Sequence, residues 1–106
     1  MNYLNQIAIS SIDSSTFTGN LQAINSAGLP NSCFKIRIIN NSDRDVTISF
    51  DGTTNHDFLK SGETYELNLL SGSLPNDYGV RVRQGTVIYV SGLAGGTGLV
   101  YLSGCY

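Results

Sequence analysis

Hydrophobic and polar residues alternate most regularly between Phe34 and Asp51. The stretch opens with Phe-Lys-Ile-Arg-Ile and closes with Val-Thr-Ile-Ser-Phe, and residues 40–44 between them are rich in Asn, Ser and Asp. Strand side chains point alternately to opposite faces, so each half is predicted to be a strand with one apolar face. Asn, Asp and Ser favour turns. The pattern therefore predicts a β-hairpin with a loop of roughly five residues.

Similar short runs continue toward the C-terminus, at residues 64–70, 78–83, 86–90 and 99–105. Turn signals separate the runs roughly every eight to twelve residues, a spacing typical of a sandwich or a small barrel. We expect an all-β fold, a small antiparallel β-sandwich of about seven or eight short strands, Ig-like or jelly-roll-like. Periodicity does not encode strand order, so a barrel remains the alternative.

Residues 1–32 have a different character. Asp13 carries their only charge. Ile7 and Ile9 fit one strand face, whereas Phe17, Leu21 and Ile24 fit no period. With 106 residues in all, one domain is expected. We place the β-sandwich domain at residues 33–106, with an extended N-terminal segment at residues 1–32. That segment is predicted to be either an edge strand of the domain or an arm laid over a neighbouring subunit.

The surface is expected to be polar but largely uncharged, because only 13% of the residues are charged while 41% are hydrophobic. Such a surface can be buried against a neighbour without the cost of desolvating many ions. The net charge of −2 and the absence of a Lys/Arg cluster argue against nucleic acid as a partner. Neither a secretory signal nor a run of 18 apolar residues is found, so no membrane association is expected and synthesis in the cytoplasm is predicted.

The single histidine, His56, lies beside Asp57 and near Asp51, which makes this the one cluster of possible ligands. One histidine without spaced cysteines does not supply a typical zinc ligand set, and calcium needs more oxygen ligands. We therefore interpret these residues as a loop whose side chains bond the backbone, and we expect no metal and no cofactor.

Two cysteines, Cys33 and Cys105, are predicted to be free buried thiols, with a single disulfide as the alternative. A nucleophilic cysteine needs a neighbouring base, and no local signature pairs either one with His56. The glycine-rich residues 92–98 lack the lysine and the following helix of a phosphate-binding loop. The sequence therefore predicts no catalytic residues and a protein that is not an enzyme.

Candidate contact residues come from three sources. Lys35 and Arg37 share one predicted strand face, and Arg81 and Arg83 share another, so they form one basic patch if those strands lie in one sheet, or otherwise a solvated face. Tyrosines and the apolar N-terminal residues add contact area. The residues predicted to contact a partner are Tyr3, Leu4, Ile7, Ile9, Lys35, Arg37, Arg81, Arg83, Tyr101 and Tyr106.

A strand followed by Asp-Gly, His-Asp, an apolar pair, Gly and another strand precedes a C-terminal hairpin of the type Gly-Thr-x-Val-Tyr, which reads Gly-Thr-Val-Ile-Tyr at residues 85–89. These motifs lie at residues 35–52, 56–59, 61–64, 84–90 and 98–104. In them the chain resembles small virion structural proteins of tailed bacteriophages. The resemblance covers roughly residues 34–106, and its motifs are structural. It implies a virion part, such as a head decoration or cement subunit, a head-vertex protein or a tail adaptor.

From this resemblance we expect a non-enzymatic capsid decoration or cement protein that binds the shell of major capsid protein or another virion protein. The protein is expected in the virion, as a symmetric homo-oligomer such as a trimer. The alternative is a head-vertex, tail or fibre adaptor, including a receptor- or carbohydrate-binding module. That module would expose aromatic rings in a shallow groove, with Tyr65, Tyr78 and Tyr89 as candidates. A small hydrolase is a third class, for which no positioned base is found.

Overall fold

The structure is a computed structural model that describes residues 5–69 and 81–106. Eight strands and one 3₁₀ helix make up its regular elements. In chain order they are β1 (Ser10–Asp13), η1 (Ser14–Thr16), β2 (Gln22–Ala23), β3 (Lys35–Ser42), β4 (Val46–Ser49), β5 (Asp57–Leu59), β6 (Thr64–Asn68), β7 (Tyr89–Ser91) and β8 (Gly98–Cys105). The one described helix, three residues long, is far too short to cross a membrane.

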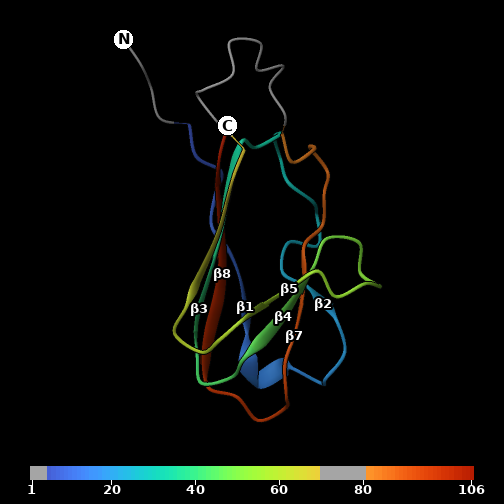
Figure 1. The fold of residues 1–106 in the computed structure, drawn as a ribbon, viewed down its shortest axis with the longest axis vertical. Helices are drawn as coiled ribbons and strands as arrows, with labels where there is room; N and C mark the ends of the chain where they lie inside the picture. Colours follow the sequence, from blue (N-terminus) through green and yellow to red (C-terminus); the bar gives the residue numbers. More distant parts are fainter. Residues whose placement is uncertain (1–4, 70–80) are drawn as a thin grey trace.

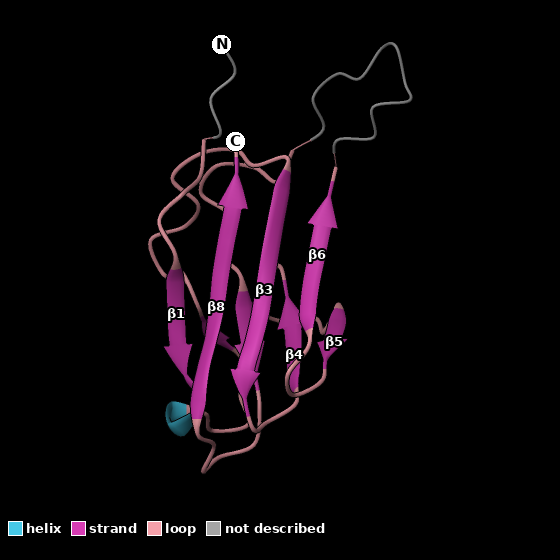
Figure 2. Ribbon diagram, turned by 90° about the vertical axis from the view of Figure 1, so that its left-hand side faces the viewer, coloured by secondary structure: helices cyan, strands magenta, loops and turns pink. Residues whose placement is uncertain are grey.

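The strands form two four-stranded antiparallel sheets (Figures 1 and 2). Sheet A has the order β1-β8-β3-β6, and sheet B has the order β2-β7-β4-β5. The two orders correspond position by position: β1 matches β2, β8 matches β7, β3 matches β4, and β6 matches β5. This is the strand order of an eight-stranded jelly roll. The predicted all-β sandwich is confirmed, and two separate sheets are present instead of a closed barrel.

The predicted hairpin between residues 34 and 51 is wrong. β3 belongs to sheet A and β4 to sheet B, so the turn between them carries the chain across the sandwich as a β-arch. The buried Asn40 holds this crossing: its amide donates to the Arg44 carbonyl at 2.7 Å and accepts from the Ser42 hydroxyl at 2.5 Å. An arch and a hairpin show the same alternation, because each apolar face points at the same core.

Residues 5–32 are part of the sandwich. β1 pairs with β8 at one edge of sheet A, and β2 pairs with β7 at one edge of sheet B. Phe17, Ile24 and Leu29 are buried in the core between them. The boundary predicted at residue 32 therefore does not divide the core, and β1 and β2 occupy the position that the edge-strand alternative describes.

A β-bulge lies between Gln6, which forms an isolated bridge with β8, and the start of β1 at Ser10. Gln6 lies opposite Cys105 and Ser10 opposite Leu102, so four steps along this segment match three along β8. As a result Ile7 points into the core while Ile9 is 67% exposed. The bulge thus turns one apolar side chain outward at the edge of sheet A.

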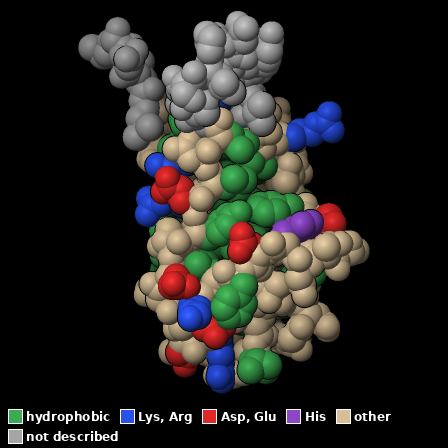
Figure 3. Space-filling model, viewed as in Figure 1, with side chains coloured by type: hydrophobic (Ala, Val, Ile, Leu, Met, Phe, Trp, Pro, Cys, Tyr) green, Lys and Arg blue, Asp and Glu red, His purple; other side chains and the backbone are tan. Residues whose placement is uncertain are grey.

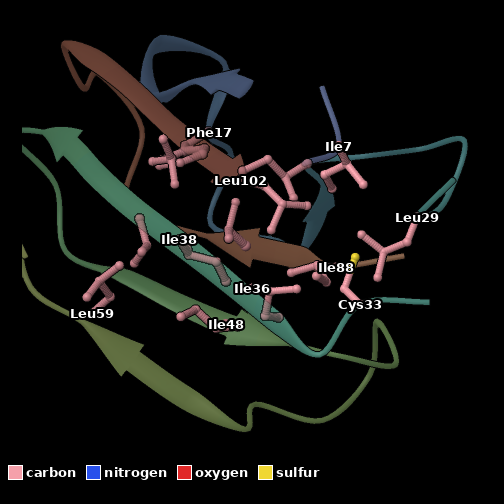
Figure 4. Packing of buried hydrophobic residues seen from close by; sticks show 14 residues of the cluster. Ile7, Phe17, Leu29, Cys33, Ile36, Ile38, Ile48, Leu59, Ile88 and Leu102 are labelled. Carbon is pink, nitrogen blue, oxygen red and sulfur yellow. The ribbon is translucent and has the colours of Figure 1, made fainter. Parts of the chain in front are cut away.

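The core lies between the two sheets, where the inward side chains of both meet (Figure 4). Ile36 and Ile38 from β3 and Ile48 from β4 are fully buried. The buried hydrophobic residues are Ile7, Phe17, Ile24, Leu29, Cys33, Ile36, Ile38, Val46, Ile48, Leu59, Ile88, Val90, Val100 and Leu102. This core fixes which side chains of every strand must face outward.

Candidate functional site

The outer face of sheet A is built mainly by its two long central strands, which Figure 2 views directly. Because inward positions are buried, alternate residues must point outward. On β3 and β8 the outward set is Lys35, Arg37, Ile39, Asn41, Leu99, Tyr101, Ser103 and Cys105. This face combines apolar, aromatic and uncharged polar side chains with two cations.

A hollow of about 390 Å³ opens on this face, and we call it the sheet A hollow. Ile39 and Tyr101 lie directly opposite each other across β3 and β8, and the exposed Ile9 stands beside them on the bulge. The lining residues are Gln6, Ile7, Ile9, Arg37, Ile39, Asn41, Tyr101 and Ser103. Its volume lies in the lower part of the range for ligand pockets, about 300–1,000 Å³.

Arg37 is the only charged residue that lines the sheet A hollow. Lys35, on the same face, is paired with Glu66 of β6 at 3.6 Å. No ion pair is found for Arg37 among residues 5–69 and 81–106. The hollow therefore offers one unpaired cation above an apolar floor.

The structure brings together three of the predicted contact residues, Ile9, Arg37 and Tyr101, in this hollow. Ile7 also borders the hollow, but it packs in the core with only 8% of its surface exposed. Tyr106 lies past the end of β8 and is 41% exposed. Tyr3 and Leu4 fall outside the described residues.

Arg81 and Arg83 do not line the sheet A hollow. They flank Val82, which forms an isolated bridge with Cys33. The Arg81 guanidinium lies 5.2 Å from the centre of the Phe34 ring, a cation–π contact. The four basic residues are thus split between a strand face and a position beside the start of β3.

A second hollow, of about 440 Å³, opens on the outer face of sheet B, and we call it the sheet B hollow. Phe58 is 54% exposed and Leu93 is 72% exposed at its border. The lining residues are Gly19, Asp43, Arg44, Asp45, Thr47, Phe58, Ser91, Gly92 and Leu93. Figure 3 shows exposed hydrophobic side chains beside acidic ones on the face that it views.

The charges of the sheet B hollow are partly balanced internally. Arg44 places its Nε 4.0 Å from the Asp43 carboxylate, and its Nη2 donates to the Gly95 carbonyl at 3.2 Å. Asp45 accepts one backbone bond, from the Ser61 N–H at 2.9 Å, and no ion pair is found for it in the described part of the chain. Asp45 is therefore the carboxylate left without a counter-charge in this hollow.

Sequence reasoning missed Phe58 and Leu93, although both leave a signal. In the apolar pair Phe58-Leu59 on one strand, only one side chain can face the core, and Leu59 is the buried one. Leu93 lies in a glycine-rich connection, where no strand offers it a buried face. The outward member of an apolar pair on one strand, and an apolar residue in a glycine-rich connection, are therefore both predicted to remain exposed.

The candidate ligand cluster around His56 holds a loop in place. The Asp51 carboxylate accepts from the N–H groups of Thr53 and Thr54 at 2.9 and 2.8 Å, and these backbone bonds hold the pKa of Asp51 well below its usual range. His56 accepts from the Phe50 N–H through Nδ1 at 3.0 Å, and its Nε2 lies 3.9 Å from the Asp51 carboxylate. These side chains fix residues 50–56 in one conformation.

Two of the three rings considered for sugar binding are partly buried. A Cβ at Gly52 would lie 3.0 Å from the Tyr89 ring, so the 50–56 loop packs on Tyr89. Tyr65 packs against the core, and burial raises the pKa of its hydroxyl. Tyr78 falls outside the described residues.

Both cysteines are free thiols in the structure. Cys33 is fully buried, its Sγ donates to the Asn31 carbonyl at 3.4 Å, and burial raises the pKa of the thiol. A raised pKa disfavours the nucleophilic thiolate. No group of three His, Cys, Asp or Glu side chains that could hold a metal ion is found within residues 5–69 and 81–106.

The two hollows are therefore surfaces on which a partner has room to bind. They lie on the outer faces of different sheets, so they point away from each other across the core. Comparisons with known protein families, with curated proteins and with solved structures gave no significant match for this chain.

Proposed function

We propose that the protein is a non-enzymatic structural component of a bacteriophage particle, and specifically a capsid decoration or cement protein that stabilises the shell of major capsid protein. The observation that carries this proposal is the pair of uncovered hollows on opposite faces of one sandwich. A protein that bridges neighbours needs at least two contact surfaces that can be occupied at once. A core shared by both sheets holds such surfaces at a fixed separation.

The chemistry of the two hollows supports protein contacts. Their linings are mainly apolar and uncharged polar residues, with Arg37 and Asp45 as the charges that lack an internal counter-charge. Burying the sheet A hollow, which has one charged side chain, costs little ion desolvation, whereas the sheet B hollow holds Asp43, Arg44 and Asp45. Jelly rolls occur in viral capsid proteins and also in lectins, so the fold agrees with this proposal without deciding it.

The mechanism would be mechanical clamping. Each contact is small, but copies arranged by the symmetry of the shell act together, so their combined hold exceeds that of any single contact. Protein bound to the intact shell and not to its separated subunits stabilises the shell by mass action.

The proposal is tested with particles produced with and without the protein. Particles that lack it should release DNA at a lower temperature, and added purified protein should restore the wild-type temperature. Protein carrying Arg37→Glu and Phe58→Arg, which changes both hollows, should restore it less well. Equal thermal stability of the two kinds of particle would contradict a cement role.

A head-vertex, tail or fibre adaptor that binds a receptor carbohydrate is the second candidate. One observation favours it: the exposed Phe58 ring lies in a hollow with Thr47, Ser91 and Asp45, which gives an apolar platform beside hydroxyl and carboxylate groups. This candidate predicts glycan binding on an array that is lost in Phe58→Ala. Binding that is unchanged in this variant would exclude the sheet B hollow as the sugar site.

A further inference from the structure

The sheet A hollow and the sheet B hollow differ in a complementary way. The sheet A hollow has an apolar floor, formed by Ile39 and Tyr101, and one unpaired cation, Arg37. The sheet B hollow has two exposed apolar side chains at its border, Phe58 and Leu93. Ile9, beside the floor of the sheet A hollow, is 67% exposed, so both surfaces carry exposed apolar side chains and the sheet A hollow adds an apolar floor.

The charges of the two hollows are also opposite in sign. Asp43 has Arg44 as its counter-charge, so Asp45 is the unbalanced group of the sheet B hollow. Arg37 is the charged group in the lining of the sheet A hollow, and Glu66, directly opposite it on β6, is ion-paired with Lys35. Opposite charges at the two surfaces favour one orientation of contact and disfavour others.

We propose that the chain binds a second copy of itself head to tail, with the sheet A hollow of one copy on the sheet B hollow of the next. Phe58 and Leu93 of one copy then fill the apolar space above Ile39 and Tyr101 of its neighbour, and Asp45 lies beside the neighbour's Arg37. The contact concerns this chain alone and does not depend on the phage role.

Contacts between like surfaces are disfavoured on the same grounds. Two sheet A hollows face to face would place two Arg37 side chains and no carboxylate of Asp45 in the contact, and two sheet B hollows would place two Asp45 carboxylates there without Arg37. Like charges in an interface cost free energy. A head-to-tail contact joins unlike surfaces, so it continues from copy to copy until it closes into a ring or extends as a chain.

The test uses analytical ultracentrifugation of the full-length chain at low ionic strength, over micromolar to millimolar concentration. Wild-type protein should form species larger than a dimer as concentration rises, and added salt should weaken them. Arg37→Glu and Phe58→Arg, each alone, should weaken association at least about tenfold, because each places like charges in the contact. Both substitutions are at exposed positions, and circular dichroism checks that each variant folds.

Mixing the two variants is the decisive step. Arg37→Glu keeps an intact sheet B hollow, and Phe58→Arg keeps an intact sheet A hollow. The mixture should therefore form a 1:1 dimer joined by the two intact surfaces. An interface between two sheet A hollows would be unaffected by Phe58→Arg, and one between two sheet B hollows would be unaffected by Arg37→Glu. Weakening by both single variants therefore excludes contacts between like surfaces.

Two further variants sharpen the result. Asp45→Asn keeps the acceptor for the Ser61 N–H but removes the charge, and should weaken association less than the reversals do. Arg83→Glu makes the same charge change as Arg37→Glu outside both hollows, and should associate like wild type. If Phe58→Arg does not fold, Leu93→Arg replaces it.

Three results would overturn the proposal. The first is wild-type protein that stays monomeric up to millimolar concentration, and the second is a variant mixture without the 1:1 dimer. The third is equal weakening by Arg83→Glu. Particle binding is measured separately, so self-association without particle binding would remove the cement role and leave this inference standing, and the reverse result would do the opposite.

Discussion

The two sheets share one core but present different outer faces. In sheet A the central strands, β3 and β8, are eight residues long, whereas no strand of sheet B exceeds four. The short strands of sheet B leave long connections, and one of these, the 50–56 loop, packs on Tyr89. The long strands therefore give sheet A a continuous outer surface. In sheet B the loops restrict the hollow to one end of the sheet, beside residues 43–45 and 91–93.

The largest loss of stability is expected from substitutions in the core, because both sheets contribute fully buried side chains to it. Ile38 in sheet A and Ile48 in sheet B are both fully buried. Replacing either with Ala should lower the free energy of unfolding by about 2–5 kcal/mol, because it removes buried methyl groups and leaves a cavity. Urea denaturation measures this. A loss below about 1 kcal/mol at either site would show that the sheets do not share one tightly packed core.

A smaller loss is expected at the arch that joins the sheets. Asn40→Ala removes the side-chain bonds to Arg44 and Ser42 inside the protein, and should cost about 1–3 kcal/mol. Asn41→Ala is the matched control: its side chain is exposed, so its change should stay within about 0.5 kcal/mol. Denaturant midpoints compare the two variants, and equal midpoints would contradict the role given to Asn40.

Hydrogen exchange should separate the sheets without any mutation. Amides in the middle of β3 and β8 lie between neighbouring strands over long ladders, so they should exchange most slowly. Amides of the two-residue β2 and the three-residue β5, at the edges of sheet B, should exchange faster. Equal protection across both sheets would remove the contrast between them.

The smallest effect should be the pH response of the 50–56 loop. The pKa of Asp51 is lowered in the folded protein, so its stabilising contribution is complete above its unfolded pKa of about 4. That contribution is lost as pH falls from there toward the lowered folded value. The stability difference between wild type and Asp51→Asn should therefore be constant from neutral pH down to about pH 5 and shrink below about pH 4. Thermal melts measure it, and a difference that grows on acidification would reverse the assignment.

Alternation predicted which side chains face inward. Val100 and Leu102 are buried while Tyr101 and Ser103 face outward, as the period of two requires. It also indicated that Arg37 lies on an outer face. These assignments depend only on the geometry of a single strand, which the sequence encodes directly.

Strand partners were not encoded in the same way. The residues from Phe34 to Asp51 read as a hairpin because β3 and β4 have the same alternation whether they pair or face each other across the core. Ile7 and Ile9 read as one face, but the bulge against β8 turns Ile9 outward. The sheet A hollow depends on that bulge and on a pairing between distant strands, so no local pattern predicted it.

The most direct test of the structural role is the copy number of this protein in purified, salt-washed phage particles, measured by quantitative mass spectrometry against the major capsid protein. The cement role predicts near parity between the two proteins, and a few copies per particle would instead favour the vertex or tail adaptor. Particles that contain none of the protein would contradict the virion role altogether.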